Sequence, residues 1–570
     1  MARENWTSSI GFILASAGSA IGLGNIWKFP YVAGKNGGGS FVLVYVLCVL
    51  LIGLPVMCAE MLIGRHTRRN VINAMGKVEL IARQPALRWG LVGLAVALAG
   101  ILAGQQAWGL CGLTVAAALA FGIKGFAVLG WICTGVALAI LSYYAVVGGW
   151  IVDYLWRSIS GGLCLVGEST AEAAKHSEGI FGGYIANPWR VLVGFVVFMG
   201  LTGAVILGGI RSGIERVSKV LMPLLFVLLV VVIVRSVTLP GAAAGVSFLL
   251  RPTMAGFTPQ VLLMALGQAF FSLSLGMAIT VTYGSYLHRE HNVLRAAGWV
   301  AVLDTLAALL GGLAIFPAVF AAGLNPSAGP GLIFGALPAT FAAMPLGNFW
   351  AACFFFMLLI AAVTSSASLL ECGATVFIER LRRGHRRGSR RVSVIIGFGL
   401  CTLLGLLTVF STVDWAQLPA LVARGMAWMC GALMRGSWFD TLDNFASNWV
   451  LPFTALGIAL LVGWAWTPRR AAPELLASGE EPKLPRWFLR YGHYELADWA
   501  QGRKGFSMVL LAAWGGLIRW VAPVAIVIVF LNSSGLLERP EAPAAEPVAA
   551  EVPAEAPAEM PAEMPAEATP

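Results

Sequence analysis

The stretch AGSAIGLGNIWKFP, residues 17–30, decides the fold. It lies inside an apolar run long enough to cross a lipid bilayer, yet it contains Gly18, Gly22, Gly24, Asn25 and Pro30. Glycine and proline are the residues that least favour a helix interior. We therefore expect the helix to be interrupted here. An interruption frees backbone carbonyls, which can bind a cation, and amide N–H groups, which can bind an anion.

The composition of the 570-residue chain indicates a protein that lies largely within a membrane. Hydrophobic residues make up 58% of the sequence, charged residues only 12%, and the mean hydropathy is +0.80. Since lipid cannot hydrogen-bond a backbone group, spanning segments must be helices or a closed barrel. Runs such as 217–237 and 392–413 are too long and too evenly apolar for barrel strands. We predict an all-α polytopic membrane protein.

Basic residues predict the orientation in the membrane. The formal net charge of +10 does not indicate a nucleic-acid partner, because lysines and arginines gather in alternate loops, at 65–88, 211–219, 288–295 and 380–391. The intervening loops are poor in both, at 158–190, 238–260 and 323–345. The positive-inside rule then places the N-terminus and the basic loops in the cytoplasm.

Hydropathy predicts eleven main spans, near residues 10–30, 38–63, 124–157, 191–209, 217–237, 261–288, 294–322, 347–379, 392–413, 443–466 and 506–532. A further apolar stretch, 88–122, must cross twice or not at all, because one crossing would invert every later loop. Gly104, Gln105 and Gln106 supply a turn for an inserted helical hairpin, which we favour over a single interfacial helix.

A second span carries the same kind of interruption as the first. Segment 261–288 contains GQAFFSLSLGMAITVTYGSY, with Ser272, Ser274 and Gly276 at its middle. Glycines in membrane helices are often only packing residues. Two broken spans, each opening one half of the chain, instead indicate an inverted-repeat transporter with its site at the membrane midplane.

The chain then divides at its span boundaries. We expect a first repeat over 1–237, which includes the inserted hairpin, and a second repeat over 238–466. A cytoplasmic connection would occupy 467–505 and the eleventh span 506–532. The tail 538–570 is rich in Pro, Ala and Glu and cannot form a core, so we expect it to be disordered.

Polar groups elsewhere in the apolar runs agree with a buried site. Ala361, Thr364, Ser365 and Ser368 share one helix face in AAVTSSASLLE. Such hydroxyls can also simply hydrogen-bond to carbonyls of their own helix. Carboxylates within spans are costly, so Asp304, Glu60 and Glu371 are candidates for site residues, or else structural hydrogen-bond anchors.

At these residues the sequence resembles the neurotransmitter:sodium symporter family, especially its bacterial amino-acid transporters such as the leucine transporter. The matching stretches, in order, are GLGNIWKFPYVAGKNGGGSF, GLPVMCAEMLIGR, GGIRSGIERVSKVLMP, GQAFFSLSLG, AIFPAVF and AAVTSSAS. The resemblance covers most of residues 3–466 and, more loosely, 506–535. It implies a five-plus-five inverted-repeat fold with broken first and sixth helices, in a bacterial inner membrane. It also implies sodium-coupled import of a neutral amino acid by alternating access.

The resemblance implies two sodium sites. The first would consist of the Ala20 carbonyl, the Asn25 amide oxygen, Ser272 and Asp304, together with the substrate carboxylate. The second would consist of carbonyls of Gly18, Ile21 and Ala361 with the hydroxyls of Thr364 and Ser365. Chloride is not expected to be required, because Asp304 can supply the negative charge and Ala308 offers no hydroxyl. Tyr45, Gln268 and Ser272 leave a residual anion site open.

The substrate site and the gates are carried over in the same way. The substrate would lie among Ser19, Gly22, Gly24, Ile140, Tyr144, Phe271, Ser274, Met277, Ser365 and Leu369. This wall is uncharged, so we expect a hydrophobic or aromatic amino acid. Arg3 and Glu379, with Trp6 beside them, resemble the cytoplasmic gate, and Lys28 and Asp443 the outer gate. Lys28 replaces the arginine of the leucine transporter, which removes bidentate bonding.

Two other functions are weighed against transport. An intramembrane enzyme would need a nucleophile with a base, or a metal cluster. The nine cysteines form no C-x-x-C pair, and all six histidines are expected in connecting loops (His66, His176, His288, His291, His385 and His493). A transport-inactive amino-acid sensor would keep the fold but lose ion ligands, whereas every expected ligand position here holds a competent group.

Overall fold

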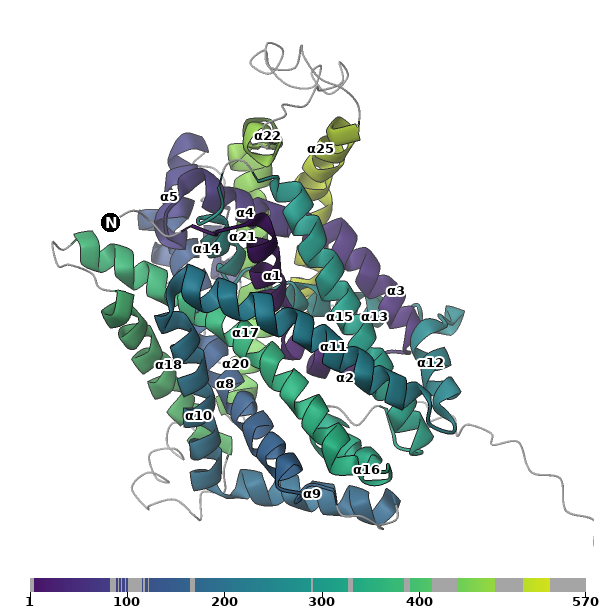
Figure 1. Cartoon of the computed structure of the whole chain (residues 1–570). Helices are drawn as coiled ribbons and strands as arrows, with labels where there is room; N and C mark the ends of the chain where they lie inside the picture. Colours follow the sequence, from purple (N-terminus) through teal and green to yellow (C-terminus); the bar gives the residue numbers. More distant parts are fainter. Residues whose placement is uncertain are drawn as a thin grey trace, which may run out of the picture.

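The structure is a computed structural model that describes residues 5–82, 122–164, 170–288, 291–326, 332–383, 390–412, 438–476 and 506–533, with isolated positions between 89 and 120. Throughout these residues the regular secondary structure is helical, and the helices pack into one bundle (Figure 1). Nine helices in this part of the chain are long and apolar enough to cross a membrane without a break. Two further spans are broken, which confirms the predicted all-α polytopic fold.

The first five spans, in which η marks π-helical turns, are α1 (Ser9–Ala20) with η1 (Gly24–Lys28) and α2 (Phe29–Lys35); α3 (Gly39–Cys48), η2 (Val49–Gly53) and α4 (Leu54–Thr67); α8 (Ala127–Ile159); α10 (Pro188–Leu207); and η3 (Ile210–Glu215) with α11 (Arg216–Val237). The next five are α13 (Pro259–Ser272) with α14 (Ile279–Gly284); α15 (Val293–Ala321); α17 (Gly347–Arg383); α18 (Arg390–Thr412); and α20 (Trp438–Asn444), η7 (Phe445–Val450), α21 (Leu451–Leu460) and η8 (Leu461–Trp466). The last span consists of α25 (Phe506–Gly516), η10 (Leu517–Val521) and α26 (Ala522–Ser533).

Each predicted span has a counterpart, and the differences are at the ends. The second span continues through Thr67, a turn beyond the predicted end at residue 63, because its last turn packs against the rest of the bundle rather than entering water. His66 therefore lies in a helix and not in a loop, as does His176 in α9 (Thr170–Ala186). The inserted hairpin at 88–122, except for isolated positions, and the tail at 538–570 lie outside the described residues.

Short helices cap both ends of the bundle, and hydropathy did not predict them. α5 (Val71–Ala82) and α22 (Pro468–Leu476) lie at the end where the chain begins, which we call the N-terminal face (Figure 1). α9 and the pair η5 (Leu332–Ala336) and α16 (Leu337–Ala342) lie at the opposite face. α12 (Ala242–Leu250) also belongs to a connection between spans. The predicted loops are therefore partly ordered covers over the two ends of the bundle.

The centre of the bundle is built from α8 and α17. In each of them 83% of an apolar stretch of 18 residues is buried, compared with 28% of such a stretch in the span that contains α11 and 39% in the last span. The more exposed helices carry large apolar side chains outward, as a lipid-facing ring requires. α1 packs against α11, α15 and α17. The first broken helix thus lies inside the bundle, where its free backbone groups are shielded from lipid.

Candidate functional site

The first span is broken as its glycines predict. α1 ends at Ala20, Ile21 is extended with ψ of 94°, and the helix axis bends by 48° before it resumes at Gly24. A Cβ atom on Gly22 would lie 2.9 Å from Tyr144 Oη and 3.0 Å from Ser365 Oγ. A Cβ on Gly24 would lie 3.1 Å from the Phe271 ring. Both glycines therefore leave room for side chains of neighbouring helices that approach closely at the break.

The second broken span is stabilised by a buried carboxylate. Between α13 and α14, Ser274, Gly276 and Ala278 have positive φ angles of 54°, 77° and 64°. The Gly276 amide, freed from the helix, donates to Glu60 Oε1 at 2.7 Å, and the Thr280 hydroxyl donates to Glu60 Oε2. Glu60 is fully buried on α4. It serves as a hydrogen-bond anchor for the break, which was one of the two roles left open by the sequence.

The predicted first sodium site brings Asn25, Ser272 and Asp304 together. Asn25 Nδ2 lies 3.0 Å from Ser272 Oγ, 3.0 Å from the Asp304 carbonyl oxygen and 2.8 Å from Asp304 Oδ1. An amide nitrogen has two hydrogens but here faces three oxygens. Asn25 Oδ1 accepts a hydrogen bond from the Gly22 backbone amide at 3.2 Å, so the side-chain amide would have to turn over to bring Oδ1 to the same point. The four oxygen atoms would then form the hard ligand set that an alkali cation needs.

The charge of this cluster also fits a cation. Asp304 is fully buried, and no ion pair joins it to a lysine or arginine in the described part of the chain. Its Oδ2 accepts hydrogen bonds from Ser272 Oγ at 2.7 Å and from Tyr45 Oη at 3.2 Å. A buried carboxylate is costly unless a positive charge accompanies it. Ala20 lies beside the cluster as a lining residue of the adjacent cavity.

The predicted second sodium site lies where α1 meets α17. A Cβ on Gly18 would lie 3.4 Å from Thr364 Cβ, which shows how closely the two helices approach. Ser365 Oγ reaches across to the Ser19 carbonyl at 3.0 Å. Thr364 Oγ1 instead donates to the Ile360 and Ala361 carbonyls of its own helix, at 3.0 and 3.1 Å. These hydroxyl oxygens keep lone pairs that a cation can use once the hydroxyls rotate.

A small cavity adjoins both breaks. It is lined by Ala20, Gly22, Leu23, Gly24, Ile140, Tyr144, Phe271, Ser274, Met277, Ser365 and Leu369. All of the predicted substrate residues except Ser19 are among them. Ser19 lies behind the wall, where its hydroxyl bonds Ser368 Oγ at 2.7 Å. The sequence missed Ala20 and Leu23 as lining residues, although the break next to them was a signal for both.

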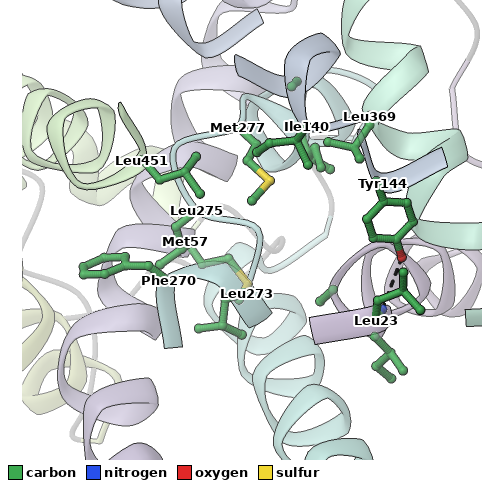
Figure 2. Packing of buried hydrophobic residues seen from close by; sticks show 14 of the residues in the cluster. Leu23, Met57, Ile140, Tyr144, Phe270, Leu273, Leu275, Met277, Leu369 and Leu451 are labelled. Carbon is green, nitrogen blue, oxygen red and sulfur yellow. Dashed lines mark hydrogen bonds between the residues drawn. The ribbon is translucent and has the colours of Figure 1, made fainter. Parts of the chain in front are cut away.

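The cavity has one polar side and one apolar side. Figure 2 shows Ile140, Met277 and Leu369 gathered together, while the Tyr144 hydroxyl points to the backbone of Leu23. The Leu23 amide donates to that hydroxyl at 3.2 Å. None of the lining residues carries a charge. A ligand with a polar head and an uncharged apolar body fits this division.

Trp6, the predicted neighbour of the cytoplasmic gate, is buried at the N-terminal face. Its side chain is 1% exposed, its Nε1 donates to the Tyr283 carbonyl at 3.1 Å, and its ring packs edge-on against Phe12, Tyr283 and Tyr286. Glu379 accepts hydrogen bonds from the Asn70 amide at 2.9 Å and from Asn73 Nδ2 at 2.8 Å. Arg3 lies outside the described residues, so its pairing with Glu379 stays a prediction.

The predicted outer gate residues lie in separate contacts. Lys28 Nζ lies 4.1 Å from the centre of the Phe271 ring, a cation–π contact. Asp443 accepts hydrogen bonds from Tyr143 Oη at 2.9 Å and from Ser447 Oγ at 3.0 Å. The ion pairs between described residues do not include Lys28 with Asp443. Their predicted pairing is therefore not among the contacts of the described residues and stays a prediction.

Glu371, the third intramembrane carboxylate, has a partner of opposite charge. Arg390 at the start of α18 binds it through Nη2 at 2.5 Å and Nη1 at 3.1 Å, and Tyr286 Oη donates to it at 2.9 Å. It is fully buried. Because its charge is balanced within the protein, Glu371 joins helices rather than facing the cavity.

Comparison with known proteins agrees with this geometry. The model of the sodium:neurotransmitter symporter family matches residues 3–95 and 184–478. An uncharacterized sodium-dependent transporter of Bacillus subtilis, YhdH, is 36% identical over 532 residues, which are 93% of this chain and 98% of the relative. One from Haemophilus influenzae is 33% identical, over 85% of this chain and 94% of the relative.

A solved structure shares the fold. The crystal structure of MhsT in complex with L-phenylalanine superimposes with a TM-score of 0.70 at 35% identity, over 93% of this chain and all of MhsT. This agreement confirms the five-plus-five architecture with broken first and sixth helices. The chain therefore belongs to the sodium:neurotransmitter symporter family, a family of sodium-coupled membrane symporters rather than enzymes.

Proposed function

We propose that the protein imports a neutral amino acid with a hydrophobic or aromatic side chain, coupled to two sodium ions. The observation that carries the substrate class is the cavity wall, which is uncharged and places Ile140, Met277 and Leu369 opposite the helix break. A side chain of Asp, Glu, Lys or Arg would enter this wall unpaired and lose its hydration. The phenylalanine bound to the related MhsT supports an aromatic or large apolar substrate.

The polar side of the cavity would hold the backbone of the amino acid. Amides near Gly22 and Gly24 and the Tyr144 hydroxyl can receive the carboxylate, since the break leaves backbone N–H groups without helical partners. Carbonyls of Phe271 and Ser274 at the second break can receive the ammonium group. Gly22 offers no side-chain carboxylate, so a simple amine would lack a counter-charge.

Sodium would be co-transported at the two oxygen clusters. The cluster of Asn25, Ser272 and Asp304 lies beside the proposed carboxylate position, so ion and substrate would stabilise one another there. Each sodium charge that moves inward through 100 mV supplies about 2.3 kcal/mol. Two ions could therefore concentrate a zwitterion strongly.

Chloride would not be needed for this cycle. Tyr45 Oη and Ser272 Oγ, two donors that could bind an anion, both donate to Asp304 Oδ2. Ala308 is buried and adds no hydroxyl. The protein's own carboxylate would thus supply the negative charge that an external anion supplies otherwise.

The N-terminal face would lie in the cytoplasm of a bacterial inner membrane. The helix ends and connections at this face contain Arg65, Arg68, Arg69, Lys77, Arg211, Arg216, Lys219 and Arg295. Basic residues are retained on the cytoplasmic side of membrane proteins. In this orientation Trp6 closes the inner exit and Lys28 lies toward the outer entrance.

Uptake into proteoliposomes tests the proposal. The full chain, reconstituted with an inward sodium gradient, should accumulate labelled leucine or phenylalanine, and a potassium gradient should not replace sodium. Competition by each standard amino acid should show strong inhibition by large apolar and aromatic ones. Inhibition by glutamate or lysine alone would refute the substrate class. Sodium-dependent binding without accumulation would identify the protein as a transport-inactive sensor instead.

A further inference from the structure

α22, the short helix after the tenth span, is docked onto the N-terminal face. Thr467, with φ of 66°, ends the span and turns the chain before α22 begins. Ala471, Ala472 and Leu475 of α22 are fully buried, and the helix packs on α4, η8 and α15. A helix of nine residues that buries one face in this way is part of the bundle rather than a connection beside it.

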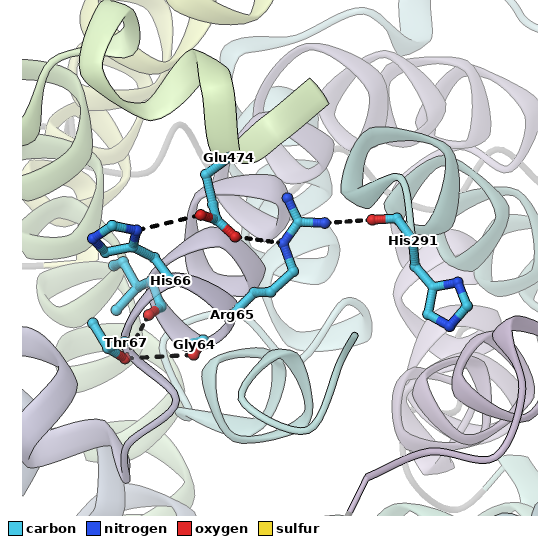
Figure 3. A network of polar contacts seen from close by, with 7 residues as sticks. Gly64, Arg65, His66, Thr67, His291 and Glu474 are labelled. Carbon is cyan, nitrogen blue, oxygen red and sulfur yellow. Dashed lines mark hydrogen bonds and ion pairs between the residues drawn. The ribbon is translucent and has the colours of Figure 1, made fainter. Parts of the chain in front are cut away.

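An ion pair fixes α22 to the end of the second span. Arg65 Nε lies 2.8 Å from Glu474 Oε1, and the Arg65 side chain is completely buried. His66 Nδ1 lies 3.3 Å from Glu474 Oε2 (Figure 3), and the His66 ring also contacts the Trp466 ring. Burial alone would raise the pKa of the Glu474 carboxyl, but His66 and Arg65 lower it below its usual value of 4.5. The carboxylate is thus charged when α22 is docked.

The same arginine reaches the connection between the second broken span and α15. Arg65 Nη1 donates to the carbonyl of His291, as Figure 3 shows. His291 Nδ1 in turn lies 2.6 Å from the hydroxyl of Ser9, the first residue of α1. A chain of polar contacts therefore links α22, through Arg65 and His291, to the first broken helix and to the connection that follows the second.

These linked elements are the ones that close the N-terminal face. The second span and α14 touch through their backbones, since a Cβ on Gly64 would lie 2.0 Å from the Val281 carbonyl oxygen. Trp6, just before α1, donates to the Tyr283 carbonyl of α14. Opening the cavity toward this face requires α1 and α14 to separate. Arg65 and Glu474 contact the segments that lie next to α1 and α14.

We propose that α22 is a latch on the N-terminal face, in which Arg65 and Glu474 are positioning residues that keep the inner exit closed. The inference rests on the proposed alternating-access function, which requires this face to open. While α22 is docked, Arg65 has its carboxylate partner and fixes the His291 carbonyl. Displacement of α22 leaves the guanidinium buried without that partner, so opening and undocking are coupled. Removal of the Glu474 carboxylate takes away the partner that Arg65 has while α22 is docked. The closed arrangement then loses stability, and the population shifts toward the open face.

Hydrogen–deuterium exchange on the full chain in lipid nanodiscs tests the latch. E474Q keeps the shape of the side chain but loses the charge that pairs with Arg65. Amides in 279–291 and 7–20 should exchange at least about tenfold faster in E474Q than in the wild type. E474D, which retains the carboxylate, should restore much of the protection.

A matched control is available at the opposite face. Asp153 pairs with Arg157 Nε at 2.6 Å on α8, and this pair is also partly buried. D153N removes a comparable ion pair without touching the N-terminal face, so exchange in 279–291 should remain unchanged. This comparison separates a specific latch from a general loss of one ion pair.

Two results would overturn the proposal. If amides in 279–291 and 7–20 exchange as slowly in E474Q as in the wild type, the ion pair does not restrain this face. Faster exchange throughout the bundle, including α18, would show that Glu474 is needed for folding rather than for closure. Exchange is measured without transport. A chain that shows the predicted shift but does not accumulate amino acids would therefore contradict the proposed function and not the latch.

Discussion

Ser272 Oγ donates a hydrogen bond to Asp304 Oδ2 at 2.7 Å, and this contact joins the last residue of α13 to the middle of α15. The serine is where the second broken span stops being helical. The aspartate is a fully buried carboxylate that also accepts from Asn25 and Tyr45. The break and the negative charge thus meet at one point, which is the arrangement that a co-transported cation needs.

Replacement of Asp304 by asparagine should weaken sodium activation and create a need for chloride. The variant keeps the size of the side chain but removes the buried negative charge that would face the ion. We expect the sodium concentration for half-maximal uptake to rise roughly 10- to 100-fold, or about 1.4 to 2.8 kcal/mol. Uptake by D304N should fall when gluconate replaces chloride, whereas wild-type uptake should not. Equal chloride dependence of the two proteins would contradict this role of Asp304.

Removal of the Thr364 hydroxyl should weaken sodium dependence through the second cluster. T364A and N25A should each raise the sodium requirement by roughly tenfold, or about 1.4 kcal/mol. Thr408 provides the control, since it is buried and its hydroxyl donates only to the Leu404 carbonyl of its own helix, at 3.2 Å. T408A should leave the sodium titration unchanged. Unaltered titrations in both T364A and N25A would reject the two sodium assignments.

The sequence predicts the spans well because membrane helices have a simple compositional signal. The breaks at Gly22 and Gly276 were predictable for the same reason, since glycine in an apolar run stands out. The helix α22 was not predicted, because its nine residues are too few to span a membrane and its contact with Arg65 joins positions more than 400 residues apart in the chain. Contacts between distant segments leave no local pattern.

The candidate site residues also divide into those that the sequence predicts and those that depend on contacts it does not show. Asp304 and Asn25 were identifiable because a polar group within a span is costly. The hydrogen bonds of Thr364 to its own helix, and the cation–π contact of Lys28 with Phe271, depend on side-chain rotamers that spacing does not determine. Leu23 lines the cavity although nothing in its chemistry distinguishes it from the other leucines.

Cysteine labelling can establish which face lies in the cytoplasm. Gly182 on α9 is exposed at the opposite face and Arg68 is exposed at the N-terminal face. G182C should react with an impermeant maleimide in intact cells, and R68C only after lysis. The parent protein measures the background, which should be low because most of its described cysteines are buried. The reverse labelling pattern would invert the topology and make Trp6 part of an outer gate.

A methyl group at Gly22 should weaken substrate binding strongly while the fold persists. Its Cβ would lie 2.9 Å from Tyr144 Oη and 3.0 Å from Ser365 Oγ, so it would displace the hydroxyl proposed to receive the substrate carboxylate. We expect G22A to lose at least about tenfold in affinity for labelled leucine or phenylalanine, about 1.4 kcal/mol or more. Gly267 on α13 is the matched control, because its Cβ would meet no atom within 4 Å. G267A should bind as the wild type does, since alanine favours a helix more than glycine. Retained binding in G22A, measured by scintillation proximity on the purified protein with an unchanged melting temperature, would show that the substrate does not lie against the break in the first span.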